Sequence, residues 1–125
     1  MIENKILAKQ KYLNIETFRR TGLGVKTPVW FVQDGEVLYV RTGANSGKVK
    51  RIHLNPAVNI APCKMDGSLV GEWIPATARE VNDETIDQKV DQLLDKKYGI
   101  IKKLFMLNSR RNEFTYTILE LKVRK

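Results

Sequence analysis

The chain has 125 residues, of which 42% are hydrophobic, and its formal net charge at pH 7 is +8. This length suits one domain with an apolar core and excludes two full-sized ones, so we expect a single domain over residues 1–125. One cysteine excludes an internal disulfide framework and fits a reducing compartment. The start of the chain lacks the apolar run of a signal peptide, and no stretch reaches membrane-spanning length. We therefore expect a cytoplasmic protein with no membrane segment.

The positive charge is concentrated in the first half of the chain. Residues 1–64 carry 11 Lys/Arg against 4 Asp/Glu, whereas residues 65–125 carry 11 against 10. Such an excess indicates an anionic partner. Nucleic acid, acidic lipid and a phosphorylated small molecule all satisfy that requirement, and charge alone does not choose among them.

The first 54 residues read as strands followed by a short helix. Residues 1–11 suggest a helical or frayed lead-in, and strands are predicted over residues 12–18, 25–33 and 36–42. Asp34-Gly35 is typical of a tight hairpin between the last two strands. Pro28 lacks a backbone donor, so its strand needs an edge or a bulge there. Asn45 or Ser46 is suited to cap a helix that runs to about Leu54.

The remainder of the chain alternates again between strands and helices. Strands are predicted over residues 57–63, 71–81 and 113–123. Asn82 or Asp83 caps a longer helix that Gly99 ends, and residues 100–107 form a second short helix. The sum is a mainly β protein with six antiparallel strands in a small barrel or curved sheet, with a few short helices.

The segment "RTGANSGKVKR", residues 41–51, which we call the basic segment, carries the clearest chemical signal. A strand ends at Thr42, two glycines follow, and a capped helix begins near Ser46. A helix N-terminus presents unpaired N–H groups and a partial positive charge, which favours a phosphate. The Thr42 and Ser46 hydroxyls and the Lys48 ammonium add donors, while Lys50 and Arg51 extend the charge outward. A solvated turn with an ordinary basic helix explains the same residues about equally well.

The other reactive residues have no predicted partner residues for metal binding or catalysis. His53 is the only histidine, so a metal site is not predicted, and a structural or solvated role is favoured. Cys63 has no candidate base near it in sequence, so packing is its default role. Packing is also favoured for Trp73. No nucleophilic triad or acid–base pair is visible, and catalytic residues are not identified.

Together these segments resemble the pyridoxamine 5′-phosphate oxidase-like superfamily of FMN-binding split β-barrels. The resemblance is closer to its deazaflavin branch, the F-420-dependent oxidoreductases (flavin/deazaflavin oxidoreductase B). It is carried by "TFRRTGLGVKTPVWF" (17–31), "LYVRTGANSGKVKRIHLNPAV" (38–58), "NIAPC" (59–63), "ATARE" (76–80), and "KYGIIKKLFML" (97–107) with "RR" (110–111). It covers nearly the whole chain and implies a six-stranded Greek-key split β-barrel.

The resemblance also implies a cofactor site. The family's phosphate-gripping Thr, Ser and Lys fall on Thr42, Ser46 and Lys48, and its tricyclic ring lies along "TPVWF", often across a homodimer interface. Pyridoxamine phosphate oxidases usually carry Arg where this chain has Gly47, and they continue beyond the equivalent of Lys125, which argues against pyridoxamine phosphate as substrate. The cofactor-binding residues predicted in this way are Thr42, Asn45, Ser46, Gly47, Lys48, Lys50 and Arg51, with Pro28, Val29 and Trp30 beside the ring.

These arguments favour a homodimeric oxidoreductase that binds F-420 or FMN and passes hydride to a small organic acceptor, because the difficult chemistry would belong to the cofactor. Lys50 and Arg51, with Arg19 or Arg20, would suit the acidic tail of F-420. Two alternatives stay open. One is a flavin or deazaflavin carrier or sensor without turnover. The other, less favoured, is a basic nucleic-acid-binding β-barrel, which would interleave cations with exposed aromatic residues.

Overall fold

The computed structural model describes residues 10–99, 101 and 115–124. Within them, seven strands form one sheet: β1 (Tyr12–Phe18), β2 (Gly24–Val29), β3 (Val32–Asp34), β4 (Val37–Gly43), β5 (Ala57–Cys63), β6 (Ile74–Val81) and β7 (Tyr116–Val123). The same residues contain the helices α2 (Gly47–Leu54) and α3 (Glu84–Tyr98). The mainly β class is confirmed. Most of the predicted lead-in at residues 1–11 and nearly all of the predicted helix at 100–107 lie outside the described residues.

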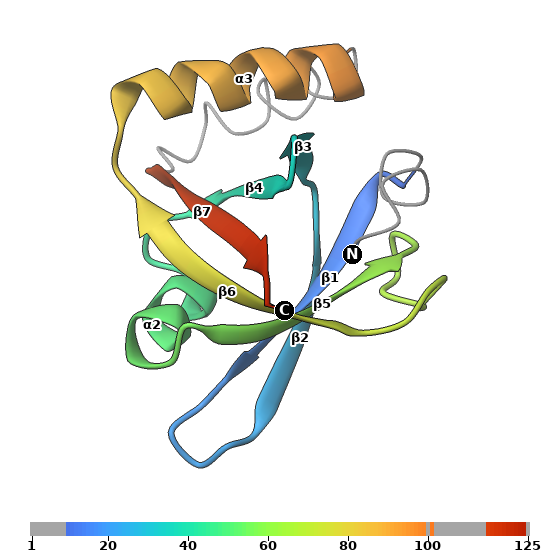
Figure 1. Ribbon diagram of the computed structural model, residues 1–125, viewed down its shortest axis with the longest axis vertical. Helices are drawn as coiled ribbons and strands as arrows, with labels where there is room; N and C mark the ends of the chain where they lie inside the picture. The colour runs from blue at the N-terminus through green and yellow to red at the C-terminus, as the bar shows by residue number, and fades with distance from the viewer. Residues whose placement is uncertain (1–9, 100, 102–114, 125) are drawn as a thin grey trace.

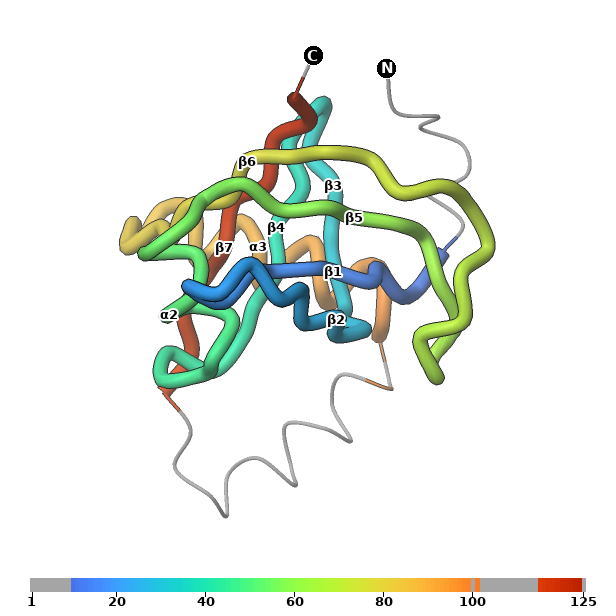
Figure 2. The backbone as a smooth tube through the Cα atoms, turned by 90° about the horizontal axis from the view of Figure 1, so that it is seen from below, coloured from blue at the N-terminus to red at the C-terminus, as the bar shows by residue number. Residues whose placement is uncertain are grey.

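The sheet closes on itself because neighbouring segments of the chain form its two edges. The strand order is β2-β1-β5-β6-β7-β4-β3, and every pairing is antiparallel. The edge strands β2 and β3 are consecutive in the chain and are separated only by Trp30 and Phe31. The sheet therefore curls until its edges approach this link, and a split β-barrel results (Figure 1, Figure 2).

The link between β2 and β3, which we call the Phe31 joint, explains why seven strands replace the predicted six. The predicted strand at residues 25–33 breaks here, because Phe31 bonds to α3 and not to a neighbouring strand. The Phe31 N–H donates to the Tyr98 hydroxyl oxygen at 3.1 Å, and the Phe31 carbonyl accepts from Lys97 Nζ at 3.0 Å. The Tyr98 hydroxyl also lies within donating distance of the carbonyl oxygens of Phe31 (2.9 Å) and Lys11 (2.7 Å).

Two apolar clusters pack against opposite faces of the sheet. Alternate residues of the strands point into the barrel, as the twofold strand repeat requires. The inner cluster comprises Leu13, Ile15, Phe31, Leu38, Val40, Val49, Ile52, Val58, Ile60, Ala76, Ala78, Leu119 and Leu121. The outer cluster joins β3, β4 and β7 to α3, which lies across that face (Figure 1), and comprises Val32, Tyr39, Val90, Leu94, Tyr98 and Ile118.

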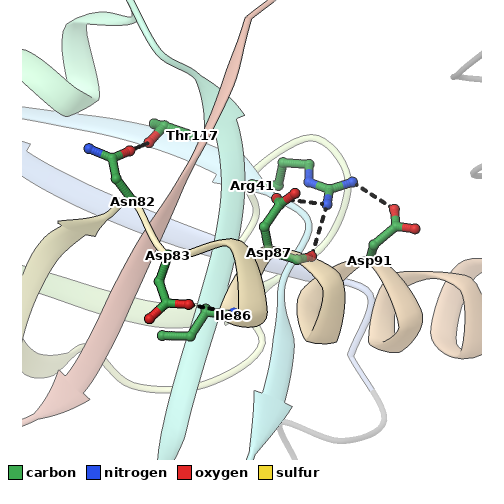
Figure 3. Close-up of polar contacts among 7 residues, drawn as sticks. All are labelled: Arg41, Asn82, Asp83, Ile86, Asp87, Asp91 and Thr117. Carbon is green, nitrogen blue, oxygen red and sulfur yellow. Dashed lines mark hydrogen bonds and ion pairs between the residues drawn. The ribbon is translucent and has the colours of Figure 1, made fainter.

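The helix α3 has a side-chain N-cap, and an ion-pair cluster joins it to β4 (Figure 3). The Asp83 side chain accepts from the N–H groups of Thr85 and Ile86, which confirms it as the N-cap. Arg41 on β4 pairs with Asp91 at 3.0 Å and with Asp87 at 3.3 Å. Gly99 ends the helix with a positive φ of 50°, a conformation that suits glycine.

Turn and edge predictions also have clear outcomes. Asp34 pairs with Val37 across a tight turn in which Gly35 has φ 62°, so the hairpin is confirmed. Pro28 pairs with Asn14 in the edge strand β2, as its missing donor requires. The strand predicted over residues 71–81 begins only at Ile74. Among the described helices, none is both long enough and apolar enough to traverse a bilayer.

Candidate functional site

The short helix α2 closes one end of the barrel. Its apolar residues Val49 and Ile52 are buried in the inner cluster. Two polar contacts then hold it against the strands: Arg51 Nε donates to Thr17 Oγ1 on β1 at 2.6 Å, and His53 Nε2 lies 2.7 Å from Glu80 Oε1 on β6. Apolar packing on one face with polar contacts to two strands fixes how α2 sits on the barrel.

The strand residues that hold α2 belong to a polar collar, by which we mean Thr17, Thr42, Glu80 and Thr117. Each continues the inward-facing alternation of its strand by one step beyond the last apolar residue. Thr17 is fully buried, and Thr42 and Thr117 are paired across β4 and β7. The Thr117 hydroxyl donates to Glu80 Oε2 at 2.6 Å. This bond, followed by the His53 contact, lowers the pKa of the Glu80 carboxyl.

The N-terminus of α2 starts at the predicted residue but lacks the predicted capping bond. Ser46 is the N-cap, with extended backbone angles, yet its hydroxyl makes no side-chain capping hydrogen bond. Ser46 Oγ is buried and has no partner in the described part of the chain. The first turn of α2 contains no acidic residue. The helix therefore begins with unpaired N–H groups and a free hydroxyl, a combination that suits an added anion.

Cations surround this helix end without a carboxylate partner in the described ranges. Burial and then the neighbouring Arg51 charge lower the pKa of Lys48, and burial and then Arg19 lower the pKa of Arg51. The Arg51 side chain folds back over the first turn, so a Cβ atom on Gly47 would lie 2.6 Å from Arg51 Nη1. Partial desolvation and mutual repulsion both raise the free energy of these charges, and an anion would relieve the repulsion.

The structure divides the basic segment between different parts of the molecule. It gathers Ser46, Gly47, Lys48 and Arg51 at the start of α2. Arg41 points to α3 and is neutralised there (Figure 3). Asn45 and Lys50 are exposed, whereas Thr42 is buried at the end of β4.

The residues predicted beside the ring lie at the other end of the β1–β2 pair. Val29 pairs with Leu13, whereas Thr17, the partner of Arg51, pairs with Val25. Leu13 and Thr17 are four positions apart in the sequence, a span of about 13 Å along β1. Val29 packs on the inner cluster, and the Trp30 ring stacks on Tyr98 with centroids 4.3 Å apart and planes 5° apart. The Trp30 side chain therefore packs on α3, as its packing role predicted.

Thr17 is the residue near α2 that sequence reasoning missed. The signal was present: in "LNIET" the inward positions are Leu13, Ile15 and Thr17, so a hydroxyl stands where a third apolar residue would be expected. Polar residues at inward positions often serve a neighbouring element rather than the core itself.

His53 and Cys63 make structural and packing contacts. His53 has the predicted structural role, through Glu80. The Cys63 thiol is free and buried, and burial raises its pKa, which disfavours the reactive thiolate. No group of three or more potential metal ligands occurs among the residues that the structure describes.

Comparisons with known proteins place the fold. No protein-family model and no curated protein matches the sequence. Among solved structures, a candidate pyridoxamine 5′-phosphate oxidase from Listeria innocua matches with TM-score 0.71 and 15% identity, over 98% of this chain and 90% of that one. An F420 reductase matches with TM-score 0.62 and 19% identity, over 98% and 93%.

A third similar structure binds a different ligand. HutZ, the heme storage protein of Vibrio cholerae, matches with TM-score 0.73 and 16% identity, over 98% of this chain and 87% of that one. Likeness at this identity establishes architecture, and these three proteins share it while differing in what they bind. The chain has the split β-barrel fold that these proteins share.

Proposed function

We propose that the chain is a cytoplasmic homodimeric oxidoreductase that binds F-420 or FMN and passes hydride to a small organic acceptor. The observation that carries the proposal is the start of α2, where Ser46 Oγ is buried without a partner and Lys48 and Arg51 face no described carboxylate. A phosphoryl group there would accept from the first amides of the helix, the Ser46 hydroxyl and both cations.

The residues present fit such a cofactor. Thr17, which bonds Arg51 of α2, and the Pro28–Trp30 segment lie toward opposite ends of the β1–β2 pair, so a phosphate at α2 would leave a ribityl chain and ring to extend toward β2. The bound ring would supply hydride chemistry. The protein's own contribution would be to hold the phosphate, orient the ring along β2 and exclude water with a second copy of the chain.

Heme is a less suitable ligand for this chain, although HutZ has the same fold. The sequence contains a single histidine, His53. Its Nε2 lies 2.7 Å from Glu80 Oε1. Iron ligation through Nε2 would therefore break the contact that holds the C-terminal end of α2.

The first test is titration of the purified chain with FMN, F-420 and hemin, followed by the absorbance bands that distinguish them. We expect Lys48→Ala to weaken binding of the flavin or deazaflavin by about ten- to a hundredfold, since a charge-assisted hydrogen bond contributes about 1.5–3 kcal/mol. Lys96→Ala is the control, because Lys96 is an exposed lysine on α3 with no predicted role in the site. Binding of neither cofactor, or equal loss in both variants, would refute the proposal.

A second measurement separates an enzyme from a carrier or sensor. Stopped-flow reduction and reoxidation of the bound cofactor by quinone-like acceptors should be faster than for free cofactor if the chain is an enzyme. If the bound cofactor transfers hydride no faster than free cofactor, the carrier or sensor is the function that stands. Steeply salt-dependent binding to single-stranded nucleic acid, without cofactor binding, would favour the basic β-barrel instead.

A further inference from the structure

The Arg51 guanidinium sits in a place that only glycine at position 47 leaves open. A Cβ atom at Gly47 would lie 2.6 Å from Nη1 and 3.3 Å from Cζ of Arg51, and real Cβ atoms do not approach that closely. The two residues are one helical turn apart, so the arginine folds back along its own helix toward the N-terminus. The guanidinium therefore lies over Gly47, in the first turn of α2.

A buried hydroxyl fixes which edge of the guanidinium is free. Nε donates to Thr17 Oγ1 at 2.6 Å, and Thr17 is fully buried on β1. The Nε donor is therefore already in use, whereas Nη1 and Nη2 make no hydrogen bond or ion pair with the described residues. A guanidinium anchored through Nε presents its two terminal nitrogens as a fork, the arrangement that matches two oxygens of a phosphate.

The charges around the fork favour an anion over a return to solvent. Lys48 follows Gly47 in the first turn of α2, and Arg19 lies close enough to lower the Arg51 pKa. Two cations beside an uncompensated guanidinium would normally drive a long side chain outward. The bond to Thr17 and the space at Gly47 hold it inward against that repulsion.

We propose that Thr17 is a positioning residue that holds Arg51 as a bidentate phosphate contact, and that Gly47 is required to leave room for it. This inference rests on the proposed function. In this proposal, Thr17 on β1 and Gly47 and Arg51 on α2 together make the chain bind phosphorylated cofactor more tightly than unphosphorylated cofactor.

The experiment compares affinities for FMN and riboflavin, which differ only in the phosphate, or for the deazaflavin core of F-420 with and without its phosphate. Thr17→Val keeps the shape of the side chain but removes the acceptor, and we expect about a three- to tenfold loss of affinity for the phosphorylated ligand only. Thr17→Ser retains the hydroxyl and should restore the preference. Arg51→Lys should cost at least as much as Thr17→Val, and adding Thr17→Val to Arg51→Lys should cost nothing further.

Gly47→Ala gives a readout that a purely structural role could not produce. Alanine favours a helix relative to glycine and the clash falls on a flexible side-chain end, so stability to urea should be unchanged or higher. The phosphate preference should nevertheless fall. If Thr17→Val, Arg51→Lys and Gly47→Ala all retain the phosphate preference of the unaltered chain, the inference is wrong while the proposed function stands. If the unaltered chain binds neither phosphorylated cofactor, both are overturned.

Discussion

Replacement of Lys97 by methionine should change how stability depends on pH. Lys97 Nζ is half-buried, donates to the Phe31 carbonyl at 3.0 Å and lies 3.5 Å from the centroid of the Phe31 ring. Burial lowers the pKa of Lys97 from 10.5 to about 8. The folded chain therefore releases this proton more readily than the unfolded chain does.

The sign of the effect follows from where the proton is held. Below pH 8 the ammonium is present in both states, and the folded state carries the cost of burying it. Between pH 8 and 10.5 the unfolded state binds more protons, so stability rises with pH. The full difference would be about 3 kcal/mol, since one pKa step is worth about 1.4 kcal/mol. Solvent screening of this partly exposed group reduces the expected gain to about 1–2 kcal/mol.

The assay is urea unfolding of the unaltered chain, Lys97→Met and Lys96→Met at several pH values from 7 to 10.5. The stability of the unaltered chain relative to Lys97→Met should rise by about 1–2 kcal/mol over that range. Lys96 is the exposed neighbour, so its variant should follow the unaltered chain. A difference between the unaltered chain and Lys97→Met that does not vary with pH would refute the reasoning.

Three further outcomes test the fold. Tyr98→Phe should lower the free energy of unfolding by about 1–3 kcal/mol, measured in urea, because the Phe31 N–H loses its acceptor; unchanged stability would contradict this. Glu80→Gln should destabilise at neutral pH, an effect that disappears as pH falls through the lowered pKa of Glu80, because the Thr117 hydroxyl bonds the charged carboxylate; an acid unfolding series with a constant difference would contradict it. Leu119→Ala, at a fully buried site, should cost about 2–5 kcal/mol in thermal or urea unfolding, and a smaller loss would place Leu119 outside the core.

Local patterns in the sequence predicted most of the fold. The strands predicted at residues 12–18 and 36–42, the Asp34-Gly35 turn and the Asp83 cap depend on neighbours along the chain, and each is present in the structure. The break at Trp30 was not predictable in this way. The break depends on the hydrogen bond between Phe31 and Tyr98, which lies 67 residues later in the chain. No local pattern contains that contact.

The candidate site was predictable in part for the same reason. The start of α2 follows from Ser46 and the glycines, and its position in the chain was correct. The direction of each cation was not, because Arg41 turns to Asp87 and Asp91 on α3 and Arg51 turns to Thr17 on β1. The basic segment places four cations within eleven residues, but only the tertiary structure shows which charges are already neutralised.

The Phe31 joint has a consequence for how the barrel opens. The Phe31 joint between β2 and β3 is held by side chains of the last turn of α3, and Phe31 is fully buried. For its amide hydrogen to exchange with deuterium from the solvent, that turn must first detach. The Phe31 amide is therefore a single-residue reporter of how often the last turn of α3 undocks from the link between the two edge strands in the native protein.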